Sequence, residues 1–388
     1  MEHAQLDSKE WSQIVARLGG EEALAASARE HGAFVRARGV KSAVDVLRLA
    51  LLYGPGGHSL RSVAAMAAAV GLADVSDVAV LDRLKHAADW LQGLCKERLA
   101  CVAKEIGVKP TERPIRIVDG SRLEGPGDRV WRLHLCYDAG LARIVDAVIT
   151  TTKDGERLDR LSVTPGEIRL GDRGFPQPDG IRNTLAAGAD VLVRLTWNSL
   201  QMTTDDKPID WLKLFKMASK QGSLDMPVRV HKAHSRFEPI DMRLVIIKKP
   251  AAAATQARAK ARRASRKNQR RTDPRTLAGA DYIILLTSLE REEFPIDLVG
   301  SLYRLRWQIE LAIKRLKSIL HIDRLPAKHP DLVRAWLYAH LLLALLLDDI
   351  TATLGAISPS ATKLASNVAL AKDDPPRRRT ARRHLAAA

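Results

Sequence analysis

The sequence is short of cysteine and of aromatic residues. Phenylalanine, tryptophan and tyrosine make up only 4% of the chain, so we expect a core built mainly from leucine, valine, isoleucine and alanine. The cysteines are odd in number and show no CxxC spacing, which excludes a disulfide framework and a cysteine-based zinc site. They are Cys95, Cys101 and Cys136, a set that fits a reducing compartment and a cytoplasmic protein.

Long apolar runs are also missing. The N-terminus, MEHAQLDSKEW, is polar and lacks the apolar stretch of a signal peptide. The longest apolar run lies near residues 341–347 and is too short to cross a bilayer. We therefore expect a buried core helix there and no segment that spans a membrane.

Acidic residues are outnumbered by basic ones. The chain has 62 lysines and arginines against 45 aspartates and glutamates, which gives a formal net charge of +17. An excess of this size indicates a polyanionic partner. Nucleic acid is the first candidate and an acidic membrane surface is the second.

The first part of the 388-residue chain, residues 1–108, has a helical pattern. Stretches rich in alanine and leucine recur there with a spacing near 3.6 residues, and no alternating pattern interrupts them. Ser59 is placed to cap one helix, and Ser76 to cap a second helix from Asp77 to His86. Two short helices with a tight turn permit a helix-turn-helix DNA reader, although any helical bundle would show the same pattern.

From residue 109 the pattern changes to short strands of an α/β fold. The order of one strand, a hairpin of two strands, a short helix and a further strand is the opening of an RNase H-like fold, in which helices flank a mixed sheet. The expected strands cover residues 114–119, 130–137, 142–151, 167–172 and 189–195, and the expected helix covers 156–161 and opens at Glu156.

Residues 197–280 have a different sequence pattern, and we expect them to form a β-rich insertion in this core. Strand patterns at 227–232 and 242–249 are followed by an arm, Arg258 to Arg275, that carries nine lysines or arginines and one acid. A solvated surface helix is the ordinary explanation of such an arm, but the lack of balancing acids favours phosphate contact. The candidate contacts are Arg262, Arg263 and Lys267.

A strand pattern returns at residues 281–288, and a helix follows from about residue 297. We therefore place the catalytic core in residues 109–196 and 281–325. The remaining divisions are a helical region at 326–370 and a basic, disordered tail at 371–388.

Three acids are placed to act together on a phosphodiester. Two divalent cations about 3.5–4 Å apart cut and join such bonds, and hard cations of this kind prefer carboxylate oxygens. Asp119 and Asp172 each stand at the end of an apolar strand, where ligands of open α/β sheets bind. The third acid would be Glu310, which we place on a helix.

The helix expected around Glu310 has a charged side next to an apolar stripe. At 100° per residue, Tyr303, Arg306, Glu310 and Lys317 fall within about 40° of one another. A carboxylate among cations suits a metal ligand flanked by phosphate contacts. A plain surface salt bridge between Arg306 and Glu310 explains the same spacing, so the geometry leaves both open.

The spacing Tyr-x2-Arg-x3-Glu-x6-Lys resembles the signature of bacterial transposases of the DDE class in the insertion sequence four family. Tyr303, Arg306, Glu310 and Lys317 match it in full. The family places its first aspartate before a glycine and its second in an Asp-Arg-Gly-aromatic motif. This sequence has Val118-Asp119-Gly120 and Asp172-Arg173-Gly174-Phe175, and only Phe175 departs from the tyrosine that is common there. The similarity extends from about residue 40 to 350.

The resemblance implies cut-and-paste transposition, with Asp119, Asp172 and Glu310 as catalytic residues that hold two Mg²⁺ (or Mn²⁺) ions. A homodimer would bind the terminal inverted repeats of its element, cut the DNA through a hairpin intermediate and join the ends to target DNA. The helical residues 1–108 would be a DNA-binding domain, and the protein would be bacterial, cytoplasmic and associated with the nucleoid.

The resemblance also implies DNA contacts. In the family, the tyrosine, arginine and lysine of the signature contact phosphates near the cleaved end, a role that falls here on Tyr303, Arg306 and Lys317. Arg173 either touches phosphate as well or braces its loop. Some members hold a flipped base with an aromatic residue. The candidates are Tyr282 and Trp197, either of which could instead belong to the core.

Two other functions are compatible with the sequence. A DNA-binding protein without catalysis, derived from a decayed or repurposed element, would keep the basic character but would not need all three acids. A nuclease of RNase H-like fold would explain the acids but not the tyrosine, arginine and lysine beside them.

Overall fold

The computed structural model describes residues 11–105, 113–126, 130–151, 153–232, 238–269, 271–319, 322 and 325–357. Residues up to Leu345 form one compact unit, and a second unit begins at Leu346. The expected tail at 371–388 lies outside the described residues. The division into DNA-binding, catalytic and insertion domains stays a prediction.

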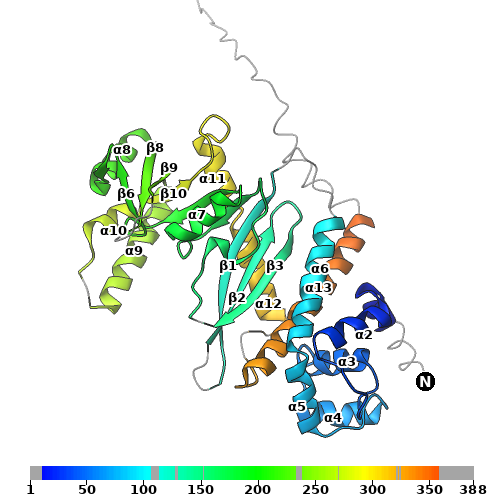
Figure 1. Ribbon diagram of the computed structural model, residues 1–388. Helices are drawn as coiled ribbons and strands as arrows, with labels where there is room; N and C mark the ends of the chain where they lie inside the picture. Colours follow the sequence, from blue (N-terminus) through cyan, green and yellow to red (C-terminus); the bar gives the residue numbers. More distant parts are fainter. Residues whose placement is uncertain are drawn as a thin grey trace, which may run out of the picture. The chain divides into compact units, whose positions relative to one another are not determined.

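The described strands form one large mixed sheet with the order β3-β2-β1-β4-β5-β10-β9-β8-β6-β7 (Figure 1). β1 pairs antiparallel with β2 and parallel with β4, and β4 pairs parallel with β5. The strands are β1 Ile115–Glu124, β2 Val130–Asp138, β3 Arg143–Thr151, β4 Ile168–Gly171, β5 Asp190–Leu195, β6 Gln201–Thr204, β7 Lys207–Pro208, β8 Ser223–His231, β9 Ile240–Lys248 and β10 Tyr282–Thr287. Every strand expected from the sequence is therefore present, and the α/β class is confirmed.

Strand β1 is longer than predicted. It does not end at Asp119 but continues to Glu124, because β2 pairs with it along its whole length, from Arg116 opposite Asp138 to Glu124 opposite Val130. Such pairing is a non-local effect that the local apolar pattern does not reveal.

The prediction of a helix at residues 156–161 is wrong. Only a single 3₁₀ turn, Leu158–Arg160, forms there, and Glu156 lies before it in a loop. The backbone is held from outside instead, because the fully buried Arg169 of β4 donates to the carbonyls of Leu158 and Leu161 over 2.7 and 2.9 Å. A side chain thus satisfies carbonyl groups that a helix would have used itself.

Residues 197–280 extend the same sheet. β9 pairs antiparallel with β10, so the strands of the expected insertion continue the core sheet beyond its last strand. Helix α9, Ala251–Lys267, confirms the helical part of the basic arm, and it exposes Arg262, Arg263 and Lys267. The region also contains α8 Trp211–Gln221 and α10 Pro274–Gly279.

The described N-terminal residues are helical, as predicted. The side chain of Ser59 caps one helix by accepting from the backbone N–H of Ser62, and Ser76 caps the next by accepting from Ala79. The helices are α2 Gly20–Glu30, α3 Ala43–Tyr53, α4 Leu60–Ala69, α5 Asp77–His86 and α6 Ala88–Glu105.

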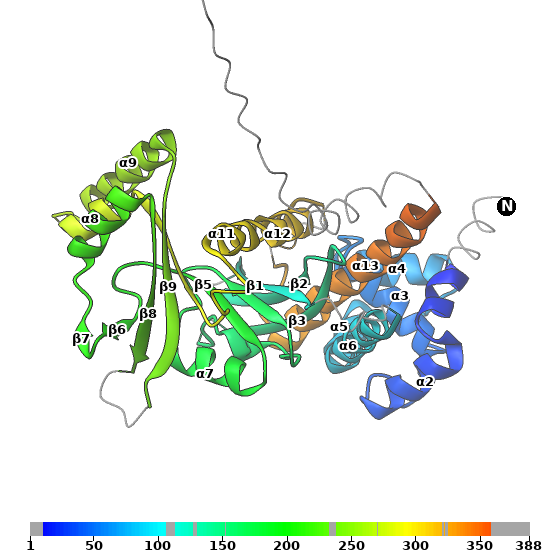
Figure 2. The ribbon, with the colours of Figure 1, turned by 90° about the horizontal axis from the view of Figure 1, so that it is seen from above.

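The prediction that a single helix carries the Tyr-Arg-Glu-Lys residues is wrong. The segment forms two helices, α11 Ile296–Arg304 and α12 Trp307–Ile319, with Arg306 in the turn between them. There the backbone N–H groups of Leu305 and Arg306 bond three residues back, which tightens the helix and interrupts it. In Figure 2, α11 and α12 lie along one face of the sheet, and α7, Pro178–Ala186, lies on the other.

The last described helix is α13, Pro330–Ile357. Its apolar stretch is longer than expected, because Pro330–Asp349 has the length and hydropathy of a membrane span. However, 67% of that stretch is buried inside the protein, as in the core helix that we expected.

Candidate active site

Asp119 and Asp172 come from neighbouring parallel strands. The ladder between β1 and β4 pairs Ile115 with Ile168 and Ile117 with Leu170, so Asp119 and Asp172 each lie two residues beyond its last pair. The charge of Asp172 raises the pKa of Asp119, so the two carboxyl groups interact and belong to one site. Asp172 follows β4 directly, as predicted, whereas Asp119 lies within β1.

The two aspartates are each held by a nearby glycine. The backbone N–H of Gly120 donates to Asp119 Oδ1 over 2.8 Å, and that of Gly174 donates to Asp172 Oδ1 over 2.7 Å. Burial raises the pKa of Asp119 to about 6, against the opposing effect of the Gly120 hydrogen bond, and the charge of Asp172 raises it further. The surroundings of Asp119 therefore oppose the ionisation of this carboxyl group.

Arg306 joins the third acid to this pair. Its guanidinium lies 3.9 Å from Asp119 Oδ2 and donates to Glu310 Oε1 over 2.5 Å. The Arg306 guanidinium also lies 5.9 Å from the centre of the Tyr303 ring. Three residues of the predicted charged side thus meet in space despite the break between α11 and α12.

Glu310 does not reach the aspartates directly. Its side chain is 56% exposed and is turned toward Arg306. Among the residues that the structure describes, no group of three histidine, cysteine, aspartate or glutamate side chains is arranged to hold a metal ion. The structure therefore brings two of the three predicted ligands, Asp119 and Asp172, together. The third, Glu310, is linked to Asp119 only through Arg306.

Lys317 lies further along α12. Its ammonium group donates to the backbone carbonyl of Arg122 in β1 over 3.4 Å. Helix α12 therefore runs past the same strand that carries Asp119, with Arg306 near the aspartate and Lys317 three residues further along β1.

A cavity of about 610 Å³ opens beside Asp172. Its wall includes Arg173, Tyr303 and Arg306 of the predicted site, and α9 contributes Lys260 among small alanine side chains. The α9 residues that face it are Ala257, Lys260, Ala261 and Ala264, whereas the exposed Arg262, Arg263 and Lys267 do not line it.

The cavity is strongly positive. Burial lowers the pKa of Lys249 to about 8, and the neighbouring guanidinium groups of Arg194 and Arg173 lower it further. Arg194 also has a buried Nε atom with no hydrogen-bond partner among the described residues. Such a place favours an anion, and phosphate fits the guanidinium groups that line it.

Sequence reasoning missed Arg194, Lys249 and Lys260. Arg194 is the last residue but one of β5, and Lys249 directly follows β9, and nothing in the local sequence marks either of them. The helical period of α9 places Lys260 on one face with Ala257, Ala261 and Ala264, a signal that was available in the sequence.

The two aromatic candidates for base stacking both line the cavity. Tyr282 is buried, its hydroxyl donates to the carbonyl of Phe215 over 2.9 Å, and its ring stacks on Phe215 at 5.2 Å. Trp197 is half-buried, donates from Nε1 to the Thr276 hydroxyl, and has the Arg275 guanidinium 3.7 Å from its ring centre. These contacts favour a core role for Tyr282. Trp197 is therefore the better candidate for stacking on a displaced base.

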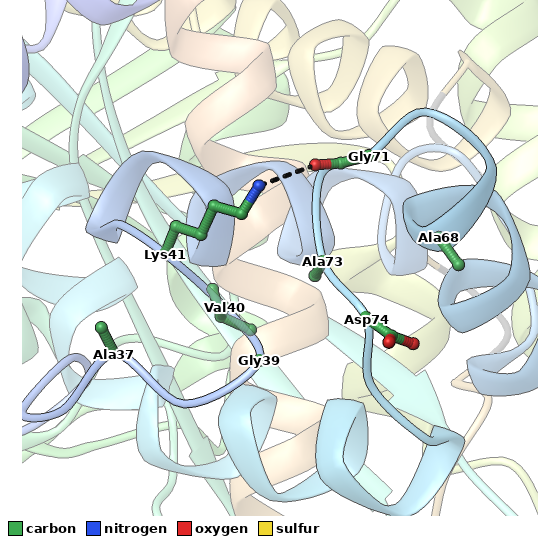
Figure 3. Close-up of a pocket in the computed structure, with 8 residues that line it drawn as sticks. All are labelled: Ala37, Gly39, Val40, Lys41, Ala68, Gly71, Ala73 and Asp74. Carbon is green, nitrogen blue, oxygen red and sulfur yellow. Dashed lines mark hydrogen bonds between the residues drawn. The ribbon is translucent and has the colours of Figure 1, made fainter.

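A second cavity, of about 690 Å³, lies among the N-terminal helices. It is lined mostly by small side chains, and the ammonium group of Lys41 donates to the Gly71 carbonyl over 3.4 Å (Figure 3). None of the three predicted catalytic acids lines it. The exposed residues of α5 are Val78, Asp82 and His86, and its last turn also carries the half-buried Arg83 and Lys85, so a DNA-reading role for this helix stays a prediction.

Comparison with known proteins identifies the family. Residues 110–347 match the family described as the Transposase DDE domain. The putative transposase InsL for insertion sequence element IS186A of Escherichia coli strain K12 is 40% identical over 346 residues, which cover 88% of this chain and 93% of that protein. The transposase for insertion sequence element IS421 of Escherichia coli is 40% identical over 347 residues, with the same coverage. The chain therefore belongs to the insertion sequence four family of DDE transposases.

Proposed function

We propose that this protein catalyses cut-and-paste transposition of an insertion sequence, by cleaving DNA at the element ends and joining them to target DNA. The observation that carries the proposal is that the parallel strands β1 and β4 bring Asp119 and Asp172 to one site, with Arg306 beside Asp119 and Glu310 bonded to Arg306. In a member of the DDE transposases, this is the place where a phosphodiester would be cut. An RNase H-like core formed by β1 to β5 is part of the same proposal.

The aspartate pair suits divalent cations. Burial and the charge of Asp172 oppose the ionisation of Asp119, and positive charge between the carboxylates would offset both. Asp119, Asp172 and Glu310 would hold two Mg²⁺ or Mn²⁺ ions, which when bound activate the attacking oxygen and stabilise the leaving one. The oxygen-only donor set fits such hard cations.

Arg306 would control the third acid. A DNA phosphate competes with Glu310 for the same guanidinium, because arginine binds phosphate and carboxylate with the same bidentate geometry. When phosphate takes Arg306 at the cleaved end, Glu310 is released and turns toward Asp119 and Asp172. Tyr303 and Lys317, on either side of Arg306, would hold neighbouring phosphates.

The positive cavity would receive the end of the DNA. Arg173, Arg194, Lys249 and Lys260 line it with positive charge, and Trp197 offers a ring for a displaced base. The exposed Arg262, Arg263 and Lys267 of α9 would contact phosphates outside it. A homodimer bound to both inverted repeats and a location at the bacterial nucleoid complete the proposal.

The test uses the protein, DNA carrying the ends of its own element, and Mg²⁺. Nicked, hairpin and strand-joined products are resolved on a denaturing gel. We expect all three with the unchanged protein, and we expect Glu310→Gln to lower the cleavage rate by about 100-fold or more. Glu292→Gln, which changes an exposed glutamate ahead of α11, is the matched control and should leave the rate unchanged.

Two outcomes would contradict the proposal. Binding of end DNA without cleavage, unaffected by Glu310→Gln, would identify a DNA-binding protein without catalysis. Cleavage without joining would identify a nuclease.

A further inference from the structure

The hydrogen-bond ladder between β1 and β4 stops before it reaches the aspartates. The last pair is Ile117 with Leu170, and β4 ends at Gly171. The backbone pairing therefore does not fix how far the Asp172 loop stands from Asp119. Something else must set this separation if the two carboxylates are to bind cations together.

Glu156 occupies the space next to both aspartate segments. A Cβ atom added to Gly120 would stand 2.7 Å from Glu156 Oε1 and 2.9 Å from its Cγ. One added to Gly174 would stand 2.1 Å from Glu156 Oε2. The glutamate thus packs directly on the two glycines whose N–H groups hold Asp119 and Asp172.

Glu156 lies on the opposite face of β1 from Asp119. Successive side chains of a strand alternate between faces, so a Cβ on Gly120 points away from the face that carries Asp119. Arg132, opposite Arg122 in the β1–β2 ladder, stands on that same side and pairs with Glu156 Oε1 over 3.1 Å. Glu156 therefore supports the Asp119 segment from the opposite face of β1, while its carboxylate also lies within electrostatic range of Asp172.

The loop that carries Glu156 is held in place. Gln177 donates to the Glu156 carbonyl over 2.9 Å, and the buried Arg169 holds the carbonyls of Leu158 and Leu161 just beyond it. Because this loop is fixed, the Glu156 side chain can hold the backbone at Gly120 and Gly174 in place. The Arg132 guanidinium offsets part of the Glu156 charge, which still contributes to the raised pKa of Asp119.

We propose that Glu156, paired with Arg132, is a positioning residue that sets the separation of Asp119 and Asp172 by packing against Gly120 and Gly174. This inference rests on the proposed function for its meaning in catalysis. It also gives a steric reason for the glycines of the Asp-Gly and Asp-Arg-Gly motifs, since neither has a positive φ that would require glycine.

The test compares Glu156→Ala, which removes the packing, with Glu156→Gln, which keeps the shape and loses the charge. We measure the binding of Mn²⁺ alone by electron paramagnetic resonance, and the rate of end cleavage. Glu156→Ala should weaken Mn²⁺ binding and slow cleavage by about 10- to 100-fold, the range for residues that orient metal ligands. Glu156→Gln should stay within about threefold of the unchanged protein in both measurements.

Gly120→Ala gives an independent check, because the methyl group would meet Glu156 alone. It should displace the Glu156 side chain, so alone it should resemble Glu156→Ala, and it should add little in the Glu156→Ala background. Asp154→Asn is the matched control, because Asp154 lies two residues from Glu156 and also pairs with an arginine, Arg160, but touches neither glycine. Thermal unfolding of every variant establishes that it is folded.

Three results would overturn the inference: Glu156→Ala behaving like the unchanged protein, Glu156→Gln failing as badly as Glu156→Ala, or additive effects of Glu156→Ala and Gly120→Ala. These are distinct from failure of the proposed function. A protein that never cleaves end DNA but shows the expected Mn²⁺ pattern would contradict transposition and support the role of Glu156.

Discussion

At the scale of residues, roles that depend on neighbours in the sequence can be predicted from it. Contacts between residues that are distant in the chain cannot. Ser59 and Ser76 are recognisable as helix caps because a cap depends on the next three residues only. The acids Asp119 and Asp172 stand out through their motifs. Glu156 resembles a helix opener instead, because its contacts with Gly120 and Gly174 involve residues distant in the chain.

Lys249 provides a prediction at this scale. Its pKa of about 8 reflects burial and the repulsion of Arg194 and Arg173, and a bound phosphate would favour the charged ammonium group. DNA binding at pH 8 should therefore take up about half a proton at this site, and affinity should fall as the pH rises from 7 to 9. Calorimetry in buffers of different ionisation enthalpy measures this uptake.

Lys249→Arg is the control for proton uptake. The guanidinium stays charged throughout this pH range, so the variant should still bind DNA but should lose the uptake. Equal uptake by the variant and the unchanged protein would show that another group takes the proton.

At the scale of elements, strand and helix positions follow from periodicity, while their ends depend on tertiary partners. The expected strands are all present, yet β1 runs past Asp119 because β2 pairs with it to Glu124. The break between α11 and α12 has no proline or glycine to announce it, so helical spacing alone predicts one continuous helix. The residues of the charged side still meet, because Arg306 contacts both neighbours across the break.

The loop held by Arg169 gives a prediction at this scale. Arg169 is fully buried and bonds Glu167 and three loop carbonyls, so Arg169→Met leaves Glu167 short of a partner and the carbonyls unsatisfied. We expect a loss of about 3 kcal/mol in the free energy of unfolding, measured with urea. Arg157→Met, which breaks the more exposed pair with Asp159, should cost about 1 kcal/mol or less. Equal losses would contradict the assigned role of Arg169.

At the scale of the whole molecule, the net charge of +17 indicates the class of partner from composition alone. What composition cannot give is the distribution of that charge. The sheet brings Arg173, Arg194 and Lys249 together from separate strands and loops, and α9 adds Lys260, so that charges spread along the chain form one cavity. The continuity of the sheet through β10 and β9 makes this possible.

Salt dependence tests whether the exposed basic residues of α9, outside the cavity, contact DNA phosphates. Each phosphate contact contributes about 0.9 to the slope of log K against log salt concentration, so changing Arg262, Arg263 and Lys267 together to glutamine should lower the slope by about 2 to 3. Fluorescence anisotropy with end DNA at several KCl concentrations measures it. The matched triple is Lys213, Lys216 and Lys220, exposed on α8, and an equal change from it would contradict the role given to α9.

The place of β10 in the sheet also governs when the protein can fold. Among the described strands β10 is the last to be synthesised, yet it lies between β5 and β9 and bonds to both. Until the ribosome has passed Thr287, both of those strands keep an open edge, and open edges invite pairing with other chains. A transcript cut short before Tyr282 should therefore yield an aggregation-prone fragment, which would also lack the proposed third metal ligand, Glu310.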